Sequence, residues 1–456
     1  MKIIFSNPPW WELGTEGSMM GAGLRMGIRA GSRWPFSRPA THRPDAFEFG
    51  GYLPAPFFLQ YAASATAAAL PAAAVVLRDS IARGESYSGF ILAMKHEAPD
   101  WIVIETATPS WSHDERVIKL LAHELPAANI ILCGTIDAAR VPGVLKENAN
   151  VVAVVQGEPD KQIAKVVGGA RGLLGHDLLS VAEMNAAPLP IWDDACALHY
   201  WDGCPVGHQP PQLQIWTSRG CPFKCVFCVW PAVMTGNDPD GTKPRAVRCY
   251  SADYVERLIR ERLAWSEGVG LRYRSIYLDD DTFNLTEKHT VAMCAVMRKI
   301  GLPWSAMCRA DTVSRETWQL MRDCGCFGVK IGFESGSQWV IDHIVNKRLD
   351  IAKAAETAIY LRQIGMSVHG TFTVGLPGET DAQRAETVAF IGALYSRGAL
   401  DTHQLSGTSE IEGTPLHTLR TRGPLAKYDG AKLGVGYDVS ADGQAKIEAM
   451  KRTGKL

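Results

Sequence analysis

This sequence has almost no net charge. Its 47 basic and 48 acidic residues leave a formal charge of −1 over 456 residues. This balance excludes a uniform field that would attract nucleic acid or an anionic membrane, although local basic grooves remain possible. A long apolar run is missing too, because the most apolar stretch, residues 61–77, is interrupted by Pro71 and is too short to span a bilayer.

The N-terminus shows no targeting segment, since residues 1–6 lead straight into a strand pattern without a cleavage site. Eleven cysteines, three of them clustered, fit a reducing compartment and a metal site better than a disulfide framework. No module that reads DNA is evident in the pattern. We therefore expect a soluble, cytoplasmic protein with no membrane span and no DNA partner.

The first third of the chain predicts an α/β domain. Its strands are rich in valine and isoleucine without polar alternation, and the helices between them predict a Rossmann-like, doubly wound parallel sheet. The predicted strands are residues 2–8, 73–78, 101–105, 130–134 and 151–155, and the predicted helices are 56–69, 88–97, 113–123 and one from Pro159. The segment 141–147 lies between the last two strands. Residues 21–39 show no period, so we expect a long loop there, whose arginines bind a phosphate-bearing ligand or face solvent.

A second β/α series follows a proline-rich connector. Six strands begin near residues 213, 275, 304, 328, 367 and 402, and five helices lie between them at 254–266, 286–300, 315–324, 351–364 and 382–397. Such a series predicts a partial (β/α)6 barrel with its functional loops at one end. The expected division is a Rossmann-like domain over 1–165, a connector over 166–211, the partial barrel over 212–420 and a short C-terminal region over 421–456.

Three cysteines follow the first strand of the second series in a C-x3-C-x2-C pattern, at Cys221, Cys225 and Cys228. Three thiolates on one short loop can ligate three irons of a cubane [4Fe–4S] cluster, which leaves the fourth iron open to another ligand. A structural zinc site would require a fourth Cys or His at matching spacing, and the nearest candidate, His208, fits no such pattern. The motif therefore predicts a reactive iron–sulfur cluster.

With this motif, the second series resembles the radical S-adenosylmethionine (SAM) superfamily over residues 212–420. The resemblance extends to strand-end segments at 278–283, 332–336 and 375–380 and to a closing loop at 413–416. It implies that the open iron chelates the amino and carboxylate groups of SAM. It also implies that an electron from an external reductant cleaves SAM to a 5′-deoxyadenosyl radical.

The same resemblance assigns SAM contacts to side chains near the cysteines and at strand ends. They are Phe227 at the adenine, Asp280 and Asp281 at the amino group, Arg309 at the carboxylate, and Glu334 with Ser335 at the ribose. Other roles remain open: core packing for Phe227, a solvated turn for the two aspartates and a structural ion pair for Arg309.

The first domain, which precedes the cluster domain, resembles the cobalamin-binding domain of cobalamin-dependent radical SAM enzymes. Ligands of doubly wound sheets bind beyond the carboxyl ends of the strands. The candidate cobalamin contacts at these ends are Thr106, Thr108, Ser110, Gly134, Thr135, Gln156, Gly157 and Glu158. The D-x-H-x-x-G motif that supplies a histidine ligand to cobalt is absent from the sequence, so the sequence does not identify a lower-face ligand of cobalt. The alternative interpretation, a Rossmann-like domain that has lost its cofactor, stays open.

Together the two resemblances imply a C-methyltransferase, in which the adenosyl radical abstracts hydrogen from an unactivated carbon and methylcobalamin supplies the methyl group. A non-methylating enzyme that cyclises or rearranges its substrate stays open, as does a cobalamin- or cluster-dependent sensor. A methylthiotransferase is disfavoured, because only Cys133, Cys196 and Cys204 precede the motif and they are widely scattered. The substrate is expected to be a peptide or protein side chain or a small metabolite.

Overall fold

The computed structural model describes residues 1–14, 23–27, 36–37, 52–136, 138–208, 210–234, 245, 247–408 and 411–422. These residues form two compact units. The first unit takes in the described residues up to Trp201 together with 229–234, and the second takes in those of 202–228 and from 245 onward. Each unit contains a six-stranded parallel sheet, which confirms the predicted fold class.

The sheet of the first unit has the strand order β10-β9-β8-β7-β1-β6. Its strands are β1 (Lys2–Asn7), β6 (Ala74–Asp79), β7 (Trp101–Thr106), β8 (Asn129–Gly134), β9 (Val151–Val155) and β10 (Gly172–Leu174). The order reverses between β1 and β7, which is the topological switch point of a doubly wound fold. The sequence did not predict β10, because a strand of three residues, one of them glycine, is too short to show a pattern.

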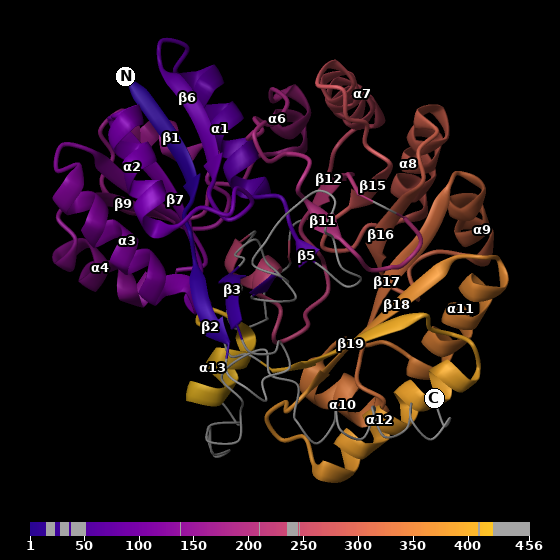
Figure 1. Cartoon of the computed structure of the whole chain (residues 1–456). Helices are drawn as coiled ribbons and strands as arrows, with labels where there is room; N and C mark the ends of the chain where they lie inside the picture. The colour runs from indigo at the N-terminus through magenta and orange to yellow at the C-terminus, as the bar shows by residue number, and fades with distance from the viewer. Residues whose placement is uncertain are drawn as a thin grey trace. The chain divides into compact units, whose positions relative to one another are not determined.

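Helices cover both faces of this sheet. They are α1 (Phe57–Ala69), α2 (Tyr87–Glu97), α3 (Trp111–Glu124), α4 (Val141–Glu147) and α5 (Gln162–Val167), with α6 (Val181–Ala186) farther along the chain. Ile4 of β1 packs with residues of α2, α3 and α4, whereas Ile3 and Phe5 pack with α1 and α5. Figure 1 shows α2, α3 and α4 together on one side of the sheet. Alternate residues of one strand therefore enter two separate cores, which explains the absence of polar alternation.

Part of the predicted loop over residues 21–39 forms strands, so that prediction is wrong there. Three antiparallel strands, β2 (Trp11–Gly14), β3 (Gly23–Gly27) and β4 (Phe36–Ser37), form a small sheet. In β3, apolar Leu24 and Met26 alternate with Gly and Arg, but five residues are too few for a clear period. The rest of the segment lies outside the described residues, together with the other arginines that were expected to bind a phosphate-bearing ligand or to face solvent.

The sheet of the second unit follows chain order, β12-β15-β16-β17-β18-β19, and all described pairs are parallel. The strands are β12 (Gln212–Ile215), β15 (Ser275–Leu278), β16 (Trp304–Cys308), β17 (Cys326–Glu334), β18 (Ser367–Val374) and β19 (Thr402–Gly407). The outer strands β12 and β19 are not paired with each other among the described residues, so the barrel is open. A short antiparallel ribbon of β13 (Ser218–Arg219) and β14 (Arg248–Cys249) lies beyond β12 in the chain.

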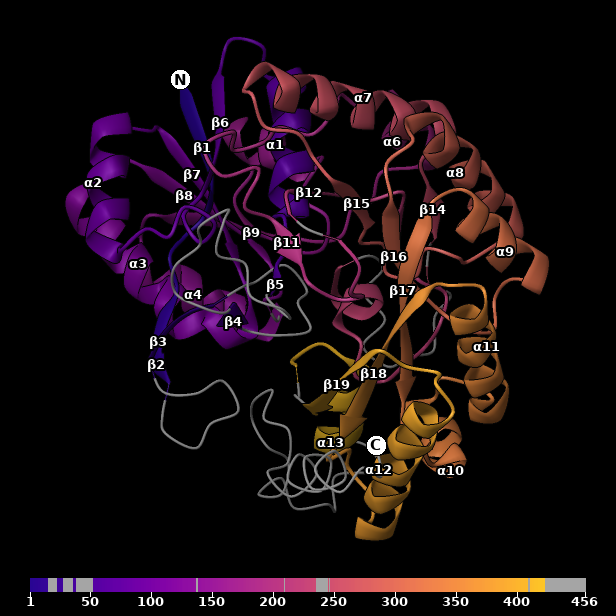
Figure 2. The same ribbon diagram turned by 45° about the vertical axis from the view of Figure 1, so that its right-hand side comes forward.

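Five main helices connect these strands. They are α7 (Ala252–Gly268), α8 (Glu287–Ile300), α9 (Arg315–Asp323), α11 (Ile351–Gln363) and α12 (Asp381–Ser396), and Figure 2 shows them along one side of the sheet. Each begins after a Ser, Thr or Asp whose side chain accepts a backbone N–H of the first turn. Across the described part of the chain, no helix combines the length and the apolarity that crossing a membrane requires.

The two faces of the second sheet differ in chemistry. Phe333 of β17 packs against Phe390 of α12 on the helix-covered face, with ring centroids 5.9 Å apart. Lys330, three residues earlier on the same strand, points to the other face and forms an ion pair with Asp202, and each of these side chains is 3% exposed. Its ammonium group also lies 5.3 Å from the centre of the Tyr277 ring. The face of the sheet opposite the helices therefore contains a buried charged pair.

Breaking the pair of Lys330 and Asp202 should destabilise the protein strongly. Lys330→Met leaves the Asp202 carboxylate buried without its cation, which typically costs about 3–5 kcal/mol. The double variant Lys330→Met/Asp202→Leu should recover most of this loss in urea unfolding. Lys353→Met, at a side chain that is 80% exposed, serves as the control and should change stability by less than about 0.5 kcal/mol. A double variant as unstable as Lys330→Met would contradict this account of the pair.

Candidate active site at the carboxyl ends of the second sheet

The cysteine loop, residues 221–228, is held by segments from far along the chain. The Val226 N–H donates to the Val345 carbonyl at 3.0 Å, and the Val226 carbonyl accepts the Leu416 N–H at 2.9 Å. Val345 ends a π-helical turn, Ile341–Val345. Cys225 and Phe227 pack against an apolar cluster of Val340, Ile344, Val345 and Leu376. Core packing is thus one role of Phe227, and its contact with adenine stays a prediction.

Asp280 fixes the entry to this loop. Its Oδ1 accepts the N–H of Thr217 at 2.9 Å, the N–H of Ser218, and the Ser218 hydroxyl at 2.7 Å, while its Oδ2 accepts the Thr217 hydroxyl at 3.0 Å. Burial raises the pKa of Asp280 to about 6, although these hydrogen bonds oppose the rise. The carboxylate therefore connects the end of β15 to the chain that leads into the cysteines.

Asp281 and Cys221 lie next to this junction. Burial is the main cause that raises the pKa of the Cys221 thiol to about 11, and the negative charge of Asp281 adds to it. The Cys221 sulfur lies 3.6 Å from the Thr282 hydroxyl. Asp281 is half-buried, whereas Asp280 is buried. The predicted contact of both aspartates with the SAM amino group stays a prediction.

Arg309, directly after β16, lies against the cysteine loop. Its guanidinium carbon is 3.6 Å from the centre of the Phe223 ring. Nε and Nη2 donate to the Asp311 carboxylate at 2.9 and 2.8 Å, and Nη1 donates to the Lys347 carbonyl at 3.3 Å. The ion pair that the sequence left open is thus present, and binding of a SAM carboxylate by Arg309 stays a prediction.

Glu334 ends β17 in a strained conformation. Its φ of 67° lies in the left-handed region, which non-glycine residues adopt rarely. Its carboxylate accepts the Lys347 ammonium at 2.7 Å and the Thr373 hydroxyl at 3.2 Å. A Cβ at Gly332 would lie 2.4 Å from Glu334 Oε1 and 2.5 Å from Lys347 Nζ, so a side chain there would displace the ends of this pair.

Lys347 is the residue of this site that the sequence analysis missed. It is 6% exposed and follows the π-helical turn in an Asn-Lys-Arg sequence that carries no recognisable spacing. Its place beside Glu334 depends on that turn, which also holds Val226. Ser335, by contrast, is fully buried: its hydroxyl lies 3.0 Å from the Thr387 hydroxyl and accepts the Ser337 N–H at 3.1 Å. Its contact with ribose stays a prediction.

The charges around Cys225 suit a thiolate ligand. Burial is the largest effect and raises the pKa of the Cys225 thiol, while Lys347, Arg309 and Arg245 lower it and Glu334 raises it. Among the described residues, no three Cys, His, Asp or Glu side chains gather around one point as ligands of a single ion would. Each cysteine of a cubane binds its own iron, so a cluster does not require the three thiols to meet at a single ion.

Glu379 closes the segment after β18 that the sequence singled out at 375–380. Its Oε2 accepts the N–H groups of Gly375 and Leu376 at 2.7 and 3.2 Å. Burial raises the pKa of this carboxyl to about 7, although the two hydrogen bonds oppose the rise. Glu379 therefore shapes the loop that carries Leu376, which packs against the cysteine loop.

The predicted cobalamin residues lie at the carboxyl ends of β7, β8 and β9. Gly134 has a φ of 104°, and a Cβ there would lie 2.1 Å from the Thr106 carbonyl oxygen. Gly134 also forms a β-bridge with Gly157. The Thr108 N–H donates to the Thr135 hydroxyl at 3.3 Å. The structure therefore brings these strand-end segments into direct backbone contact.

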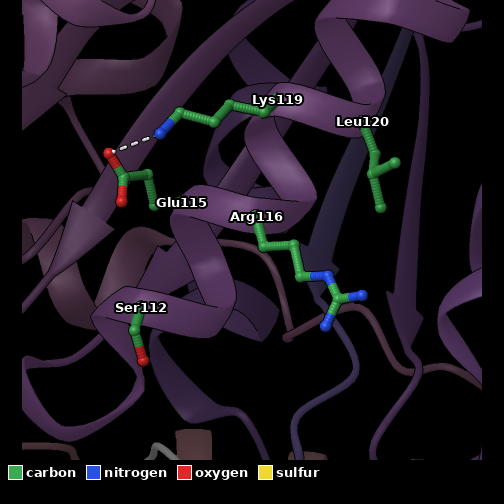
Figure 3. A pocket seen from close by; sticks show the side chains of 5 residues that line it. All are labelled: Ser112, Glu115, Arg116, Lys119 and Leu120. Atoms are coloured by element: carbon green, nitrogen blue, oxygen red, sulfur yellow. Dashed lines mark hydrogen bonds and ion pairs between the residues drawn. The ribbon is translucent and has the colours of Figure 1, made fainter.

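The remaining predicted cobalamin residues are partly engaged within the fold. The hydroxyls of Thr106 and Ser110 donate to the buried Asp114 carboxylate of α3 at 2.7 and 2.5 Å. Glu158 is buried, and the half-buried Gln156 donates its N–H to the Leu174 carbonyl. Their contacts with cobalamin stay predictions. A separate hollow on the surface of α3 contains none of them and is lined by Ser112, Glu115, Arg116, Lys119 and Leu120 (Figure 3).

Residues 216–391, which include all three cysteines, Arg309, Glu334 and Lys347, match the family model of the radical SAM superfamily. This chain contains a radical SAM domain. The match confirms the predicted [4Fe–4S] cluster and SAM as the cofactors of this domain, and the buried ion pairs at the strand ends belong to it.

Two curated relatives and one solved structure extend the comparison. The chain is 25% identical to an uncharacterized methyltransferase of Pyrococcus horikoshii over 364 residues, which cover 75% of this chain and 74% of that protein. It is also 25% identical to an anaerobic magnesium-protoporphyrin IX monomethyl ester cyclase of Cereibacter sphaeroides over 320 residues, which cover 63% of this chain and 48% of the cyclase.

The solved structure is that of OxsB, a cobalamin-dependent SAM radical enzyme with aqua-cobalamin and SAM bound. The match has a TM-score of 0.62 at 12% identity and covers all of this chain. At this identity the likeness concerns the fold alone, and the chain spans 61% of the length of OxsB.

Replacing Cys225 should prevent stable cluster binding, because two remaining thiolates cannot hold a cubane that already lacks a fourth cysteine. After anaerobic reconstitution, iron and sulfide analysis should fall from about four irons per chain to less than about one in Cys225→Ala. Cys249→Ala, at a half-buried cysteine of the neighbouring ribbon, should keep its iron. Full iron content in Cys225→Ala would refute the cluster assignment.

Glu379 should make stability depend on pH. Because its pKa of about 7 in the folded protein exceeds the usual value of about 4.5, the folded state binds the proton more tightly than the unfolded state does. The free energy of unfolding should therefore fall between pH 4.5 and 7, by about 3 kcal/mol for this shift. Glu379→Gln, which cannot ionise and still accepts both N–H groups, should lack this fall in urea unfolding at pH 5 and 8. The exposed Glu356→Gln is the control, and parallel pH curves of wild type and Glu379→Gln would contradict the expectation.

Proposed function

We propose that this protein is a cobalamin-dependent radical SAM methyltransferase that places a methyl group from methylcobalamin on an unactivated carbon. The observation that carries the proposal is the three-cysteine loop held beside the pair of Glu334 and Lys347 in a radical SAM domain. The fold likeness to OxsB over the whole chain supports the cobalamin part. The similarity to a methyltransferase of Pyrococcus horikoshii supports the methyl transfer.

The side chains at the strand ends suit the groups of SAM. When bound, the reduced cluster supplies the electron that cleaves SAM to a 5′-deoxyadenosyl radical. The buried cations Lys347 and Arg309 are suited to the methionyl carboxylate, since charge-assisted hydrogen bonds in a buried site are strong. The Glu334 carboxylate can accept hydrogen bonds from ribose hydroxyls, and Asp281 can accept one from the amino group.

In the first unit, we assign cobalamin to the carboxyl ends of β7, β8 and β9. Close contacts among Thr106, Gly134 and Gly157 bring the ends of these three strands together at the edge where doubly wound sheets bind their ligands. The protein needs an external one-electron reductant, and we propose that it works in the cytoplasm. The proposed substrate is a peptide or protein side chain or a small metabolite.

A second candidate function is radical cyclisation or rearrangement without methyl transfer. The similarity to the cyclase of Cereibacter sphaeroides favours it, although the chain covers less than half of that protein. The two candidates share the cluster, SAM and cobalamin. They differ in the fate of the methyl group.

Anaerobic turnover with methyl-labelled SAM separates these candidates. Protein reconstituted with iron, sulfide and cobalamin should form both 5′-deoxyadenosine and S-adenosylhomocysteine, because one SAM yields the radical and a second recharges cobalamin. Formation of 5′-deoxyadenosine alone would favour the cyclase-type reaction. In Cys225→Ala, 5′-deoxyadenosine should fall by at least about 100-fold, and undiminished formation there would refute the radical mechanism.

A further inference from the structure

His176 lies just beyond β10 and contacts two other segments of the first unit. Its Nε2 is 2.7 Å from the Val233 carbonyl oxygen. Because a carbonyl only accepts, Nε2 carries the hydrogen and the imidazole is the donor. On its other side, a Cβ at Gly157 would lie 2.5 Å from His176 Cδ2. The ring therefore fills the space between the end of β9 and Val233.

Val233 belongs to a π-helical turn, Trp230–Met234, that begins two residues after Cys228. This turn is part of the first unit, whereas the cysteine loop before it is part of the second. The Trp230 ring stacks on Phe58 of α1 with centroids 5.1 Å apart. The Met234 carbonyl oxygen would lie 2.7 Å from a Cβ at Gly157. The chain that leaves the cluster cysteines is thus built into the first unit.

A continuous row of close contacts connects this turn to the predicted cobalamin residues. It runs from the Thr106 carbonyl to Gly134, across the β-bridge to Gly157, and through His176 to Val233. Gly157 has a φ of 75°, so any other residue there would be strained as well as crowded. A ligand that presses on the loop at residues 156–158 therefore acts on a tightly packed contact to the turn.

We propose that His176 is a positioning residue that couples cobalamin binding to the cluster loop. This coupling rests on the proposed function, because it requires the loop at residues 156–158 to be part of the cobalamin site. Cobalamin in that site restrains Gly157 and His176, and His176 holds the turn that continues from Cys228. Since coupling between two binding sites is reciprocal, cluster binding increases the affinity for cobalamin by the same factor as cobalamin increases retention of the cluster.

The test compares hydroxocobalamin binding with and without the cluster. Dissociation constants are measured anaerobically by equilibrium dialysis for wild type, His176→Ala, His176→Gln and His123→Ala. Wild type should bind hydroxocobalamin at least about fivefold more tightly when the cluster is present. His176→Ala should lose this factor, whereas His176→Gln should keep it, because its amide N–H can still donate to Val233. His123, whose side chain is 83% exposed on α3, is the control and should keep the full factor.

A second measurement uses only cluster-loaded protein, in case the cluster-free form does not fold. Iron release to a chelator should slow at least about fivefold on addition of hydroxocobalamin in wild type and in His176→Gln, but not in His176→Ala. The coupling is overturned if hydroxocobalamin slows iron release equally in wild type and His176→Ala, or does not slow it in wild type. The cobalamin assignment stands in both cases. Failure of wild type to bind hydroxocobalamin overturns the cobalamin assignment itself and the coupling with it.

Discussion

The backbone of one residue, Val226, carries the constraint on which the site depends. Its N–H is bound by Val345 and its carbonyl by Leu416, two residues more than a hundred positions farther along the chain. The cysteines of such a short loop cannot face a cluster correctly unless both of these segments are already in place. The parallel sheet meets this condition, because it brings the carboxyl ends of all its strands to one edge. The predicted cluster site therefore depends on the complete domain and not on its motif alone.

The second unit keeps several charged groups buried where the strands end, and such groups reduce stability unless they are paired. Asp280 accepts four hydrogen bonds, and Glu334 adopts a strained backbone to meet Lys347. Strained and charged residues of this kind persist where the surrounding structure holds them and where function requires them. The low exposure of these groups also strengthens their interaction with any charged cofactor. Asp280 and Glu334, which hold these strand ends in place, are thus also among the side chains predicted to contact SAM.

The sequence predicted elements whose pattern is long or strongly apolar. The strands Val151–Val155 and Trp304–Cys308 have the predicted bounds. The assignment of Cys221, Cys225 and Cys228 as cluster ligands stays a prediction of the C-x3-C-x2-C pattern. Short elements such as β3 and β10 were missed, because their pairing partners stabilise them more than their own residues do. Lys347 and His176 were missed for a related reason. Each receives its role from a contact across more than ten residues of chain, which local patterns do not record.

The insertion of Trp230–Met234 into the first unit has a consequence for recombination between relatives. A hybrid with a single crossover between the two units would take this turn from one parent and its surroundings, Phe58, Gly157 and His176, from the other. Buried Val233 and Met234 would then meet a surface with which they did not evolve. Exchange of the first unit therefore requires two further crossovers, one on each side of the turn. The module that can be inherited intact is discontinuous in the gene although it is continuous in space.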